Sequence, residues 1–118
     1  MWEINYYTSR RGDCEVYCFL QNLKNNKYQA AILKKLDQLE QFGPYRLLSS
    51  KIVEKVDSNL YELKCHYGKS IFRALFGILS KEKKIIFLAT IFVKKQNKLT
   101  RPEIDLAKQR IKDKINNI

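Results

Sequence analysis

The stretch LYELKCHYGKSIFRALFGILSKEKKIIFLATIFVKK, residues 60–95, decides the fold of this chain. Apolar and polar side chains alternate from Leu60 to Tyr67, which predicts a strand. Gly68-Lys69 follows and predicts a two-residue hairpin turn, and Ile71 to Leu79 predicts the returning strand. The stretch therefore begins as an antiparallel β-hairpin.

A second turn and further strands extend this hairpin. Lys81-Glu82-Lys83 predicts the turn, and Ile85 to Val93 is almost wholly apolar, which is typical of an interior strand buried on both faces. Upstream, Lys51 to Val56 predicts another short strand, and Asp57-Ser58-Asn59 predicts the turn that follows it. Strands joined by such short turns form an antiparallel meander.

Before the meander, a short strand from Trp2 to Tyr7 precedes two helical patterns. Asp13 is the expected cap of the first helix, and Gly43-Pro44 is the expected end of the second. Asn25-Asn26 interrupts the pattern between them, so the two helices should form a hairpin. The apolar residues at helical spacing are Val16, Phe19, Leu20 and Leu23 in the first helix, and Tyr28, Ile32, Leu36 and Leu39 in the second.

After the meander, Thr100-Arg101-Pro102-Glu103 predicts the start of a C-terminal helix. It offers a threonine cap, a proline in the first turn and a glutamate three residues after the cap. The fold class is therefore α+β: a twisted antiparallel sheet, made of the N-terminal strand and the C-terminal meander, with an N-terminal helical hairpin and a C-terminal helix. We expect residues 1–118 to form a single domain.

The composition predicts a folded cytoplasmic protein. Of the 118 residues, 45% are hydrophobic and 12% are aromatic, which is enough apolar surface to offset the entropy of ordering the chain. There is no run of about 18 apolar residues that predicts a membrane-spanning helix, and no secretory-signal pattern at the N-terminus. Three cysteines without metal-site spacing argue against a disulfide scaffold, and we expect neither a metal nor a cofactor.

The positive charge is concentrated in the second part of the chain. The net charge is +11, of which residues 1–45 contribute +1 and residues 46–118 contribute +10. Such a basic region predicts a surface that binds a polyanion. An anionic membrane is disfavoured because no segment joins a basic face to Trp or Phe anchors. Charge alone does not separate RNA from an acidic partner protein.

Lys64 and Arg73 form a candidate phosphate site. A two-residue turn places them directly opposite each other, and opposed residues project from the same face of a sheet. The charge of Arg73 interrupts an apolar strand and therefore needs an explanation. One explanation is a phosphate site, in which Arg73 offers a planar fork of donors and Lys64 a point charge. The other is a structural salt bridge to Glu62, which shares this face.

The candidate RNA-binding residues are Lys94, Lys95, Lys98 and Arg101. They are four bases within eight residues at the end of the apolar strand, a pattern that fits either a phosphate clamp or a solvated charged loop. His66 is the only histidine; it could transfer protons or bind a metal, but no second histidine or acid pair supports it. Small core-filling residues are the favoured interpretation of Cys14, Cys18 and Cys65.

Four motifs, taken in order, resemble the RelE/ParE toxin superfamily and in particular its HigB-like, phage-derived branch. The family pattern is an LWELR strand, a YRILY strand, a GFxKK strand end and a TPxxEIxxAxxR helix. The corresponding motifs here are Leu60-Tyr61-Glu62-Leu63-Lys64, Ile71-Phe72-Arg73-Ala74-Leu75-Phe76, Phe92-Val93-Lys94-Lys95 and Thr100-Arg101-Pro102-Glu103-Ile104-Asp105-Leu106-Ala107. The resemblance spans about residues 60–110.

This resemblance implies a toxin of a type II toxin–antitoxin pair that inhibits translation. Most RelE-like and HigB-like members are ribosome-dependent endoribonucleases that cut mRNA in the decoding site without a metal. Lys64 stands at the arginine of ELR and Arg73 at the arginine of YR, so the resemblance implies that Lys64 and Arg73 are the catalytic residues. Lys94-Lys95 stands at KK. Two positions depart from the family: Phe76 replaces a tyrosine and Thr90 a histidine, and neither replacement can act as an acid or base near neutral pH.

The resemblance also implies partners and leaves alternatives. The partners are the ribosome with its mRNA and a cognate antitoxin, expected to be a helix-turn-helix protein in a toxin–antitoxin hetero-oligomer. ParE-like members instead poison DNA gyrase, which gives a second hypothesis. A third is a catalytically inactive relative that only binds the antitoxin or RNA, and a fourth is an unrelated basic binding module.

We predict that binding to ribosomes or RNA weakens steeply as the salt concentration rises, because lysines displace counterions from phosphates. Lys94→Ala and Lys98→Ala should each weaken binding and lower the slope of log affinity against log salt by about one. Fluorescence anisotropy over a salt titration measures both effects. An affinity that does not respond to salt would indicate a surface for a partner protein instead.

Overall fold

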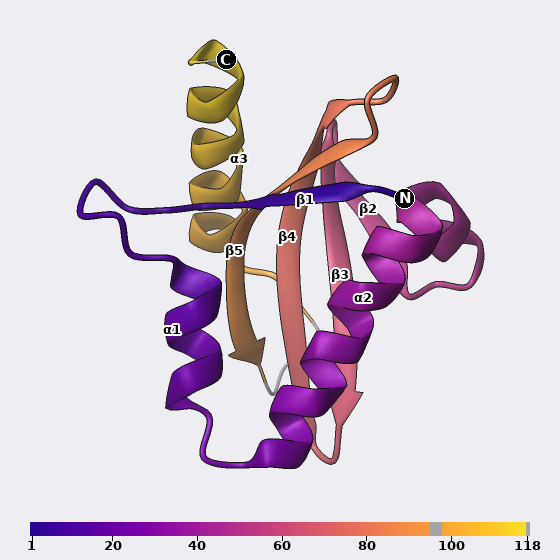
Figure 1. Cartoon of the computed structure of the whole chain (residues 1–118), viewed down its shortest axis with the longest axis vertical. Helices are drawn as coiled ribbons and strands as arrows, with labels where there is room; N and C mark the ends of the chain where they lie inside the picture. The colour runs from indigo at the N-terminus through magenta and orange to yellow at the C-terminus, as the bar shows by residue number, and fades with distance from the viewer. Residues whose placement is uncertain (95–97, 118) are drawn as a thin grey trace.

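Five strands form one twisted sheet in the order β1-β5-β4-β3-β2 in the computed structural model, which describes residues 1–94 and 98–117 (Figure 1). The strands are β1 Glu3–Tyr6, β2 Val53–Asp57, β3 Leu60–Tyr67, β4 Ser70–Ser80 and β5 Ile85–Lys94. Strands β2 to β5 form the predicted antiparallel meander. β5 is an interior strand, as its apolar sequence indicated.

β1 runs parallel to β5, with Glu3 opposite Ile85 and Tyr6 opposite Leu88. The prediction of a sheet that is antiparallel throughout is wrong at this pair. Both helices of the N-terminal hairpin and three strands separate β1 from β5 along the chain. So long a connection allows a parallel crossover, and no local turn fixes the direction of pairing.

The β3–β4 hairpin has the predicted two-residue turn. Tyr67 pairs with Ser70, and Lys64 lies opposite Arg73. Gly68 has a φ of 60°, the left-handed conformation that glycine adopts without steric cost in such a turn. This register separates the side chains of β3 by face, with Tyr61, Leu63 and Cys65 in the main core and Glu62, Lys64 and His66 on the opposite face.

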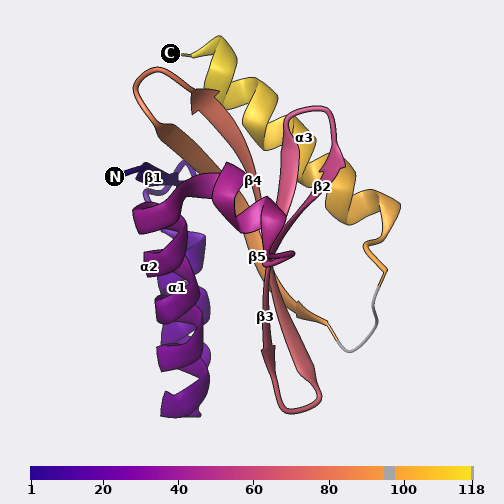
Figure 2. The same ribbon diagram turned by 90° about the vertical axis from the view of Figure 1, so that its right-hand side faces the viewer.

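Helices α1 (Glu15–Asn22) and α2 (Asn26–Ser49) form a hairpin on one face of the sheet (Figure 2). They bury the predicted apolar stripe against the sheet and form the larger core. Its members include Val16, Ile32, Leu36 and Leu39 from the helices and Leu63, Phe72, Phe76, Ile86 and Leu88 from the strands.

The helix starts differ from the prediction in detail. α1 begins after Cys14, whose side chain makes no capping hydrogen bond, so Asp13 is not the cap that the sequence predicted. α2 begins after Asn25, whose side-chain oxygen accepts hydrogen bonds from the backbone N–H groups of Lys27 and Tyr28. The asparagine that predicted an interruption therefore serves as a helix cap.

A kink at Gly43 divides α2. The sequence predicted that Gly43-Pro44 ends the helix, but further helical residues follow from Pro44 after Gly43 adopts a φ of 79°. Trp2 packs so closely against this kink that a Cβ atom placed on Gly43 would clash with Nε1 of the indole. The backbone N–H of Trp2 also donates to the carbonyl oxygen of Glu40 at 2.7 Å. The residue that precedes β1 is therefore held against the kink in α2.

Helix α3 (Arg101–Asn116) packs on the other face of the sheet (Figure 2). It begins with the predicted capping box between Thr100 and Glu103. Arg110 ties it to the rest of the domain, since Nη1 donates to Glu15 Oε2 at 2.5 Å and to the carbonyl oxygen of Ala89 at 2.9 Å. A smaller core lies beneath it, made of Leu60, Leu75, Phe87, Ala89, Ala107 and Ile111. Within the described ranges, no helix has both the length and the apolar character needed to cross a membrane.

We predict that Gly43→Ala lowers the free energy of unfolding by about 3 kcal/mol, because it adds backbone strain at positive φ and a clash with Trp2. Gly12→Ala is the matched control, since Gly12 also has a positive φ but a Cβ there would meet nothing within 4 Å. The control should cost about 1 kcal/mol. Urea unfolding followed by circular dichroism measures both, and equal losses would show that the Trp2 contact contributes nothing.

Candidate functional site

Charged side chains gather on the α3 face of the β3–β4 hairpin. Lys64 lies opposite Arg73, and Arg73 lies opposite Phe92 of β5, so these three residues form one rung across the sheet. Helix α3 crosses the end of this face that carries the β2–β3 turn, whereas the β3–β4 turn lies at the other end (Figure 2). Lys64 lies in the middle of β3, so the rung lies between these two ends of the hairpin.

Arg73 is buried and paired with Glu62. Arg73 Nη1 lies 2.6 Å from Glu62 Oε2, and the two side chains are only 2% and 3% exposed. The salt bridge that the sequence offered as the alternative explanation of Arg73 is therefore present. The catalytic interpretation required a guanidinium group that presents its planar fork to a phosphate at the surface. In this buried position, the guanidinium group of Arg73 does not do so.

Lys64 is the more accessible cation of the pair. Its side chain is 21% exposed, and Nζ lies 2.9 Å from Glu54 Oε1 and 3.6 Å from Glu62 Oε1. Glu62 thus uses one carboxylate oxygen for each cation. The order Glu54, Lys64, Glu62, Arg73 alternates in sign, so the two positive charges are balanced by two negative charges.

Glu54 is part of this cluster, although no pattern in the sequence indicated it. Glu54 lies opposite Glu62 because β2 pairs with β3 in a register that shifts between Lys55 and Asp57. A bulge of this kind leaves no reliable mark in the sequence. The position of Glu54 relative to Lys64 could be found only from the structure.

His66 lies near the cluster on the same face of β3. It is two residues beyond Lys64 and exposed, and it lies opposite Ile71, which in turn lies opposite Lys94 in β5. Every second residue of a strand projects from the same face of the sheet. The sheet therefore brings the sole histidine beside Lys64, and it brings the end of β5 to the same end of the sheet.

The candidate RNA-binding residues follow the end of β5. Lys94 is its last residue, while Lys95 lies outside the described residues. Lys98 is exposed, and Arg101 is exposed at the start of α3 with Nε 3.3 Å from Asp105 Oδ1. The backbone of Lys94 thus lies in line with His66 and Ile71 across the sheet, and Lys98 and Arg101 follow later in the sequence.

The two departures from the family pattern occupy buried positions. Phe76 is fully buried in the α1/α2 core, where its ring stacks on Tyr61 with centroids 5.5 Å apart. Thr90 is buried opposite Leu75. Neither residue lies at an exposed surface, so neither side chain can contact a ligand there.

The cysteines offer no catalytic nucleophile at this cluster. Cys65 is buried in the α1/α2 core, and burial raises the pKa of its thiol, which disfavours the reactive thiolate. Cys14 is partly buried. Cys18 is exposed, so its interpretation as a core-filling residue is wrong.

We predict that Arg73→Ala lowers the free energy of unfolding by about 3–5 kcal/mol, because it leaves the carboxylate of Glu62 buried without this cation. Arg101→Ala is the control: it breaks an exposed pair with Asp105 and should cost no more than about 0.5 kcal/mol. The double variant Arg73→Met with Glu62→Leu should recover most of the loss. Urea unfolding measures all three, and a fully stable Arg73→Ala protein would contradict a structural role for the pair.

Comparison with known proteins agrees with the resemblance in the sequence. A family model described as phage derived protein Gp49-like (DUF891) matches residues 19–112, from within α1 almost to the end of α3. A search of curated proteins gives no match. The family match covers most of the chain and includes every residue of the charged cluster. The chain therefore belongs to the phage-derived Gp49-like family, a member of the RelE/HigB-type toxin group.

Proposed function

We propose that this protein is the toxin of a type II toxin–antitoxin pair and that it stops translation by cleaving mRNA on the ribosome. Membership of the Gp49-like family is consistent with a toxin of a toxin–antitoxin system. The observation that carries the finer proposal is the placement of Lys64, His66 and the end of β5 at one end of the sheet. The net charge of +10 in residues 46–118 suits a substrate that is itself a polyanion.

The reaction proposed is an attack by the 2′-hydroxyl of RNA on the adjacent phosphate, which expels the 5′-oxygen of the next nucleotide. It needs an acceptor for the hydroxyl proton, a donor for the leaving oxygen and a positive charge beside the phosphorane. Lys64 suits the last task because its ammonium group is partly exposed. His66 suits proton transfer, because an imidazole ring can both accept and donate a proton and this side chain is exposed beside Lys64. This chemistry needs neither a metal nor a cofactor.

In this scheme Arg73 acts through Glu62. The guanidinium group holds one carboxylate oxygen of Glu62, and the other oxygen lies on the Lys64 side. Arg73 is therefore a positioning residue, which differs from its role as a phosphate ligand in the sequence-based hypothesis. Glu54 is the exposed partner of Lys64, and a phosphate that approaches the ammonium group must share it with Glu54.

The partners follow from the same proposal. Translated mRNA on the ribosome is the substrate, which places the protein in the cytoplasm. A cognate antitoxin, of the helix-turn-helix type, would bind the toxin in a hetero-oligomer and keep it inactive. A neighbouring reading frame that encodes such a protein would support the pairing.

We predict that expression of the chain without an antitoxin arrests growth with translation failing first. Lys64→Ala should lower the cleavage rate roughly a hundredfold, because it removes a charge beside the transition state. His66→Ala should lower it by a similar or larger factor, about a hundredfold or more, through lost proton transfer. Lys112→Ala, an exposed lysine on α3, is the control and should remain toxic.

Primer extension on cellular mRNA after induction measures the cleavage, and pulse labelling shows which synthesis stops first. Circular dichroism checks that each variant is folded. Replication that fails first, with DNA breaks linked to gyrase, would replace the ribonuclease proposal with gyrase poisoning. Growth arrest without mRNA cleavage or DNA breaks would also overturn it.

A further inference from the structure

An exposed aromatic surface lies at the C-terminal end of α2. Phe42 and Tyr45 are large side chains, yet they remain 42% and 44% exposed. Cations already lie over both rings: the guanidinium carbon of Arg46 is 4.7 Å from the ring centre of Phe42, and Lys81 Nζ is 5.9 Å from that of Tyr45. We call Phe42, Tyr45, Arg46 and Lys81 the aromatic platform.

Trp2 holds Tyr45 of the platform in place. The ring of Tyr45 meets the indole of Trp2 edge to face, with centroids 6.1 Å apart. Trp2 in turn packs on the kink at Gly43, and its backbone N–H bonds to the carbonyl of Glu40. A ligand that binds the rings therefore meets a surface that is already ordered, which lowers the entropy lost on binding.

A groove of ≈ 330 Å³ continues from the platform along the sheet. Lys81 belongs to both, because it lines the groove and lies over Tyr45. Lys55 and Tyr61 line the groove as well. None of the described residues that line this groove is an aspartate or a glutamate. The groove and the platform together therefore present cations beside aromatic rings.

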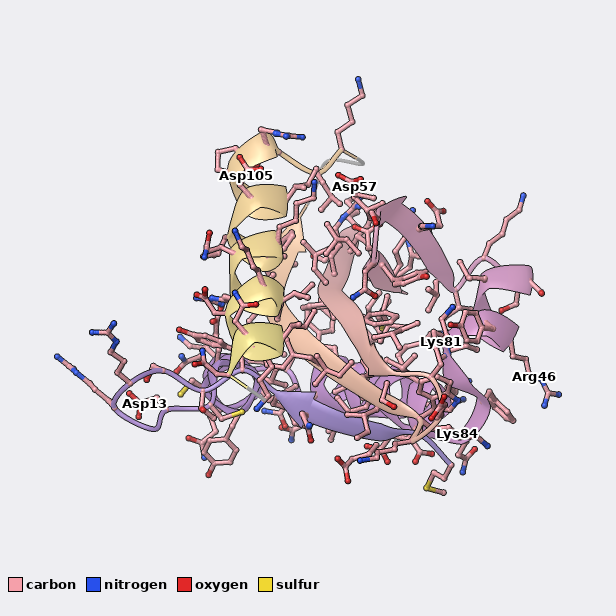
Figure 3. All side chains as sticks on the ribbon, turned by 90° about the horizontal axis from the view of Figure 1, so that it is seen from above. Asp13, Arg46, Asp57, Lys81, Lys84 and Asp105 are labelled. Atoms are coloured by element: carbon pink, nitrogen blue, oxygen red, sulfur yellow. The ribbon has the colours of Figure 1, made fainter. Side chains whose placement is uncertain are left out.

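We propose that the aromatic platform and its groove bind single-stranded RNA. Bases would stack on the rings of Phe42 and Tyr45, and phosphates would lie along Arg46, Lys81 and Lys55. Every base has a π face, so rings flanked by cations bind single strands with little sequence preference. Figure 3 shows Arg46 and Lys81 on one side of the molecule, with Lys84 beside them.

This surface is separate from the candidate site. Tyr61 and Lys55 face the α1/α2 side of the sheet, whereas Lys64 and Arg73 face the α3 side. The platform also lies by the β4–β5 turn, and the candidate site lies toward the β3–β4 turn (Figure 1). The inference goes beyond the proposed function, because binding here does not depend on cleavage.

An acidic protein segment fits the same surface less well. Stable protein interfaces bury about 1,200 Å² or more around an apolar centre. Here the apolar part is two rings that are each less than half exposed. A base needs only one ring face, so the observed surface matches RNA in size as well as in charge.

Trp2, the only tryptophan, is a built-in reporter for this proposal. We would titrate the purified chain with a fluorescein-labelled 2′-O-methyl oligoadenylate of about 12 nucleotides, a length within the range that such sites bind. This probe cannot be cut through its 2′-oxygen, so a failed cleavage mechanism does not affect the result. An unlabelled probe should change the emission of Trp2 with the same Kd that anisotropy gives for the labelled one.

Phe42→Ala and Tyr45→Ala should each raise the Kd about tenfold, and Tyr45→Phe should leave it unchanged within about twofold. Lys81→Ala should raise the Kd and flatten its salt dependence. Tyr17→Ala, an exposed aromatic on α1, and Lys112→Ala are the matched controls and should change the Kd by less than about twofold. Thermal melting checks each fold.

Several results would overturn the proposal. One is binding that leaves Trp2 emission unchanged, which would place the RNA elsewhere. Another is a Kd for Phe42→Ala that equals that of Tyr17→Ala. If a duplex of the same length bound as tightly as the single-stranded probe, stacking of bases on the rings would be excluded. If polyglutamate displaced the probe at an equal concentration of charge, the surface would be one for an acidic protein partner.

Discussion

The two-residue turn at Gly68-Lys69 is the constraint on which the rest of the structure depends. It sets Tyr67 against Ser70, and that pairing sends alternate residues of β3 and β4 to opposite faces. A shift of one residue would turn Glu62 and Lys64 into the core beneath α1 and α2 and would move Leu63 and Cys65 to the α3 face. Because the α1/α2 face has no room for charges, the apolar pattern of the whole hairpin supports this register.

The same register determines the energetics of the charged cluster. With Arg73 on the α3 face and almost fully buried, its charge needs a partner inside the protein. Glu62, two residues before Lys64 and on the same face, supplies it. A buried ion pair of this kind adds little net stability compared with apolar residues, yet the loss of either member is costly. The pair therefore fixes which side chains lie beside Lys64 more than it strengthens the fold.

Local patterns predicted most of the fold, and tertiary contacts account for what they missed. The hairpin turn, the meander, the apolar stripes of α1 and α2 and the capping box at Thr100 all arise from neighbouring residues, so the sequence contains their signals. The parallel direction of β1 and the continuation of α2 beyond Gly43 depend on distant partners. In the candidate site, the sequence predicted the opposition of Lys64 and Arg73 but could not give burial. The position of Glu54 depends on the register of β2, which includes a bulge, and the burial of Arg73 depends on tertiary packing. Only the structure gives these two features.

The parallel pairing of β1 with β5 has a consequence for the order in which the protein can fold during synthesis. Strand β1 finds its partner only when Ile85 to Leu88, far later in the sequence, have emerged from the ribosome. Arg110, near the C-terminus, then completes the contact with Glu15 at the start of α1. Contacts between such distant parts of a chain delay folding until the loop between them can close. A nascent chain therefore cannot add β1 to the sheet until β5 has been synthesised, so β1 stays without its partner strand while β2, β3 and β4 are made.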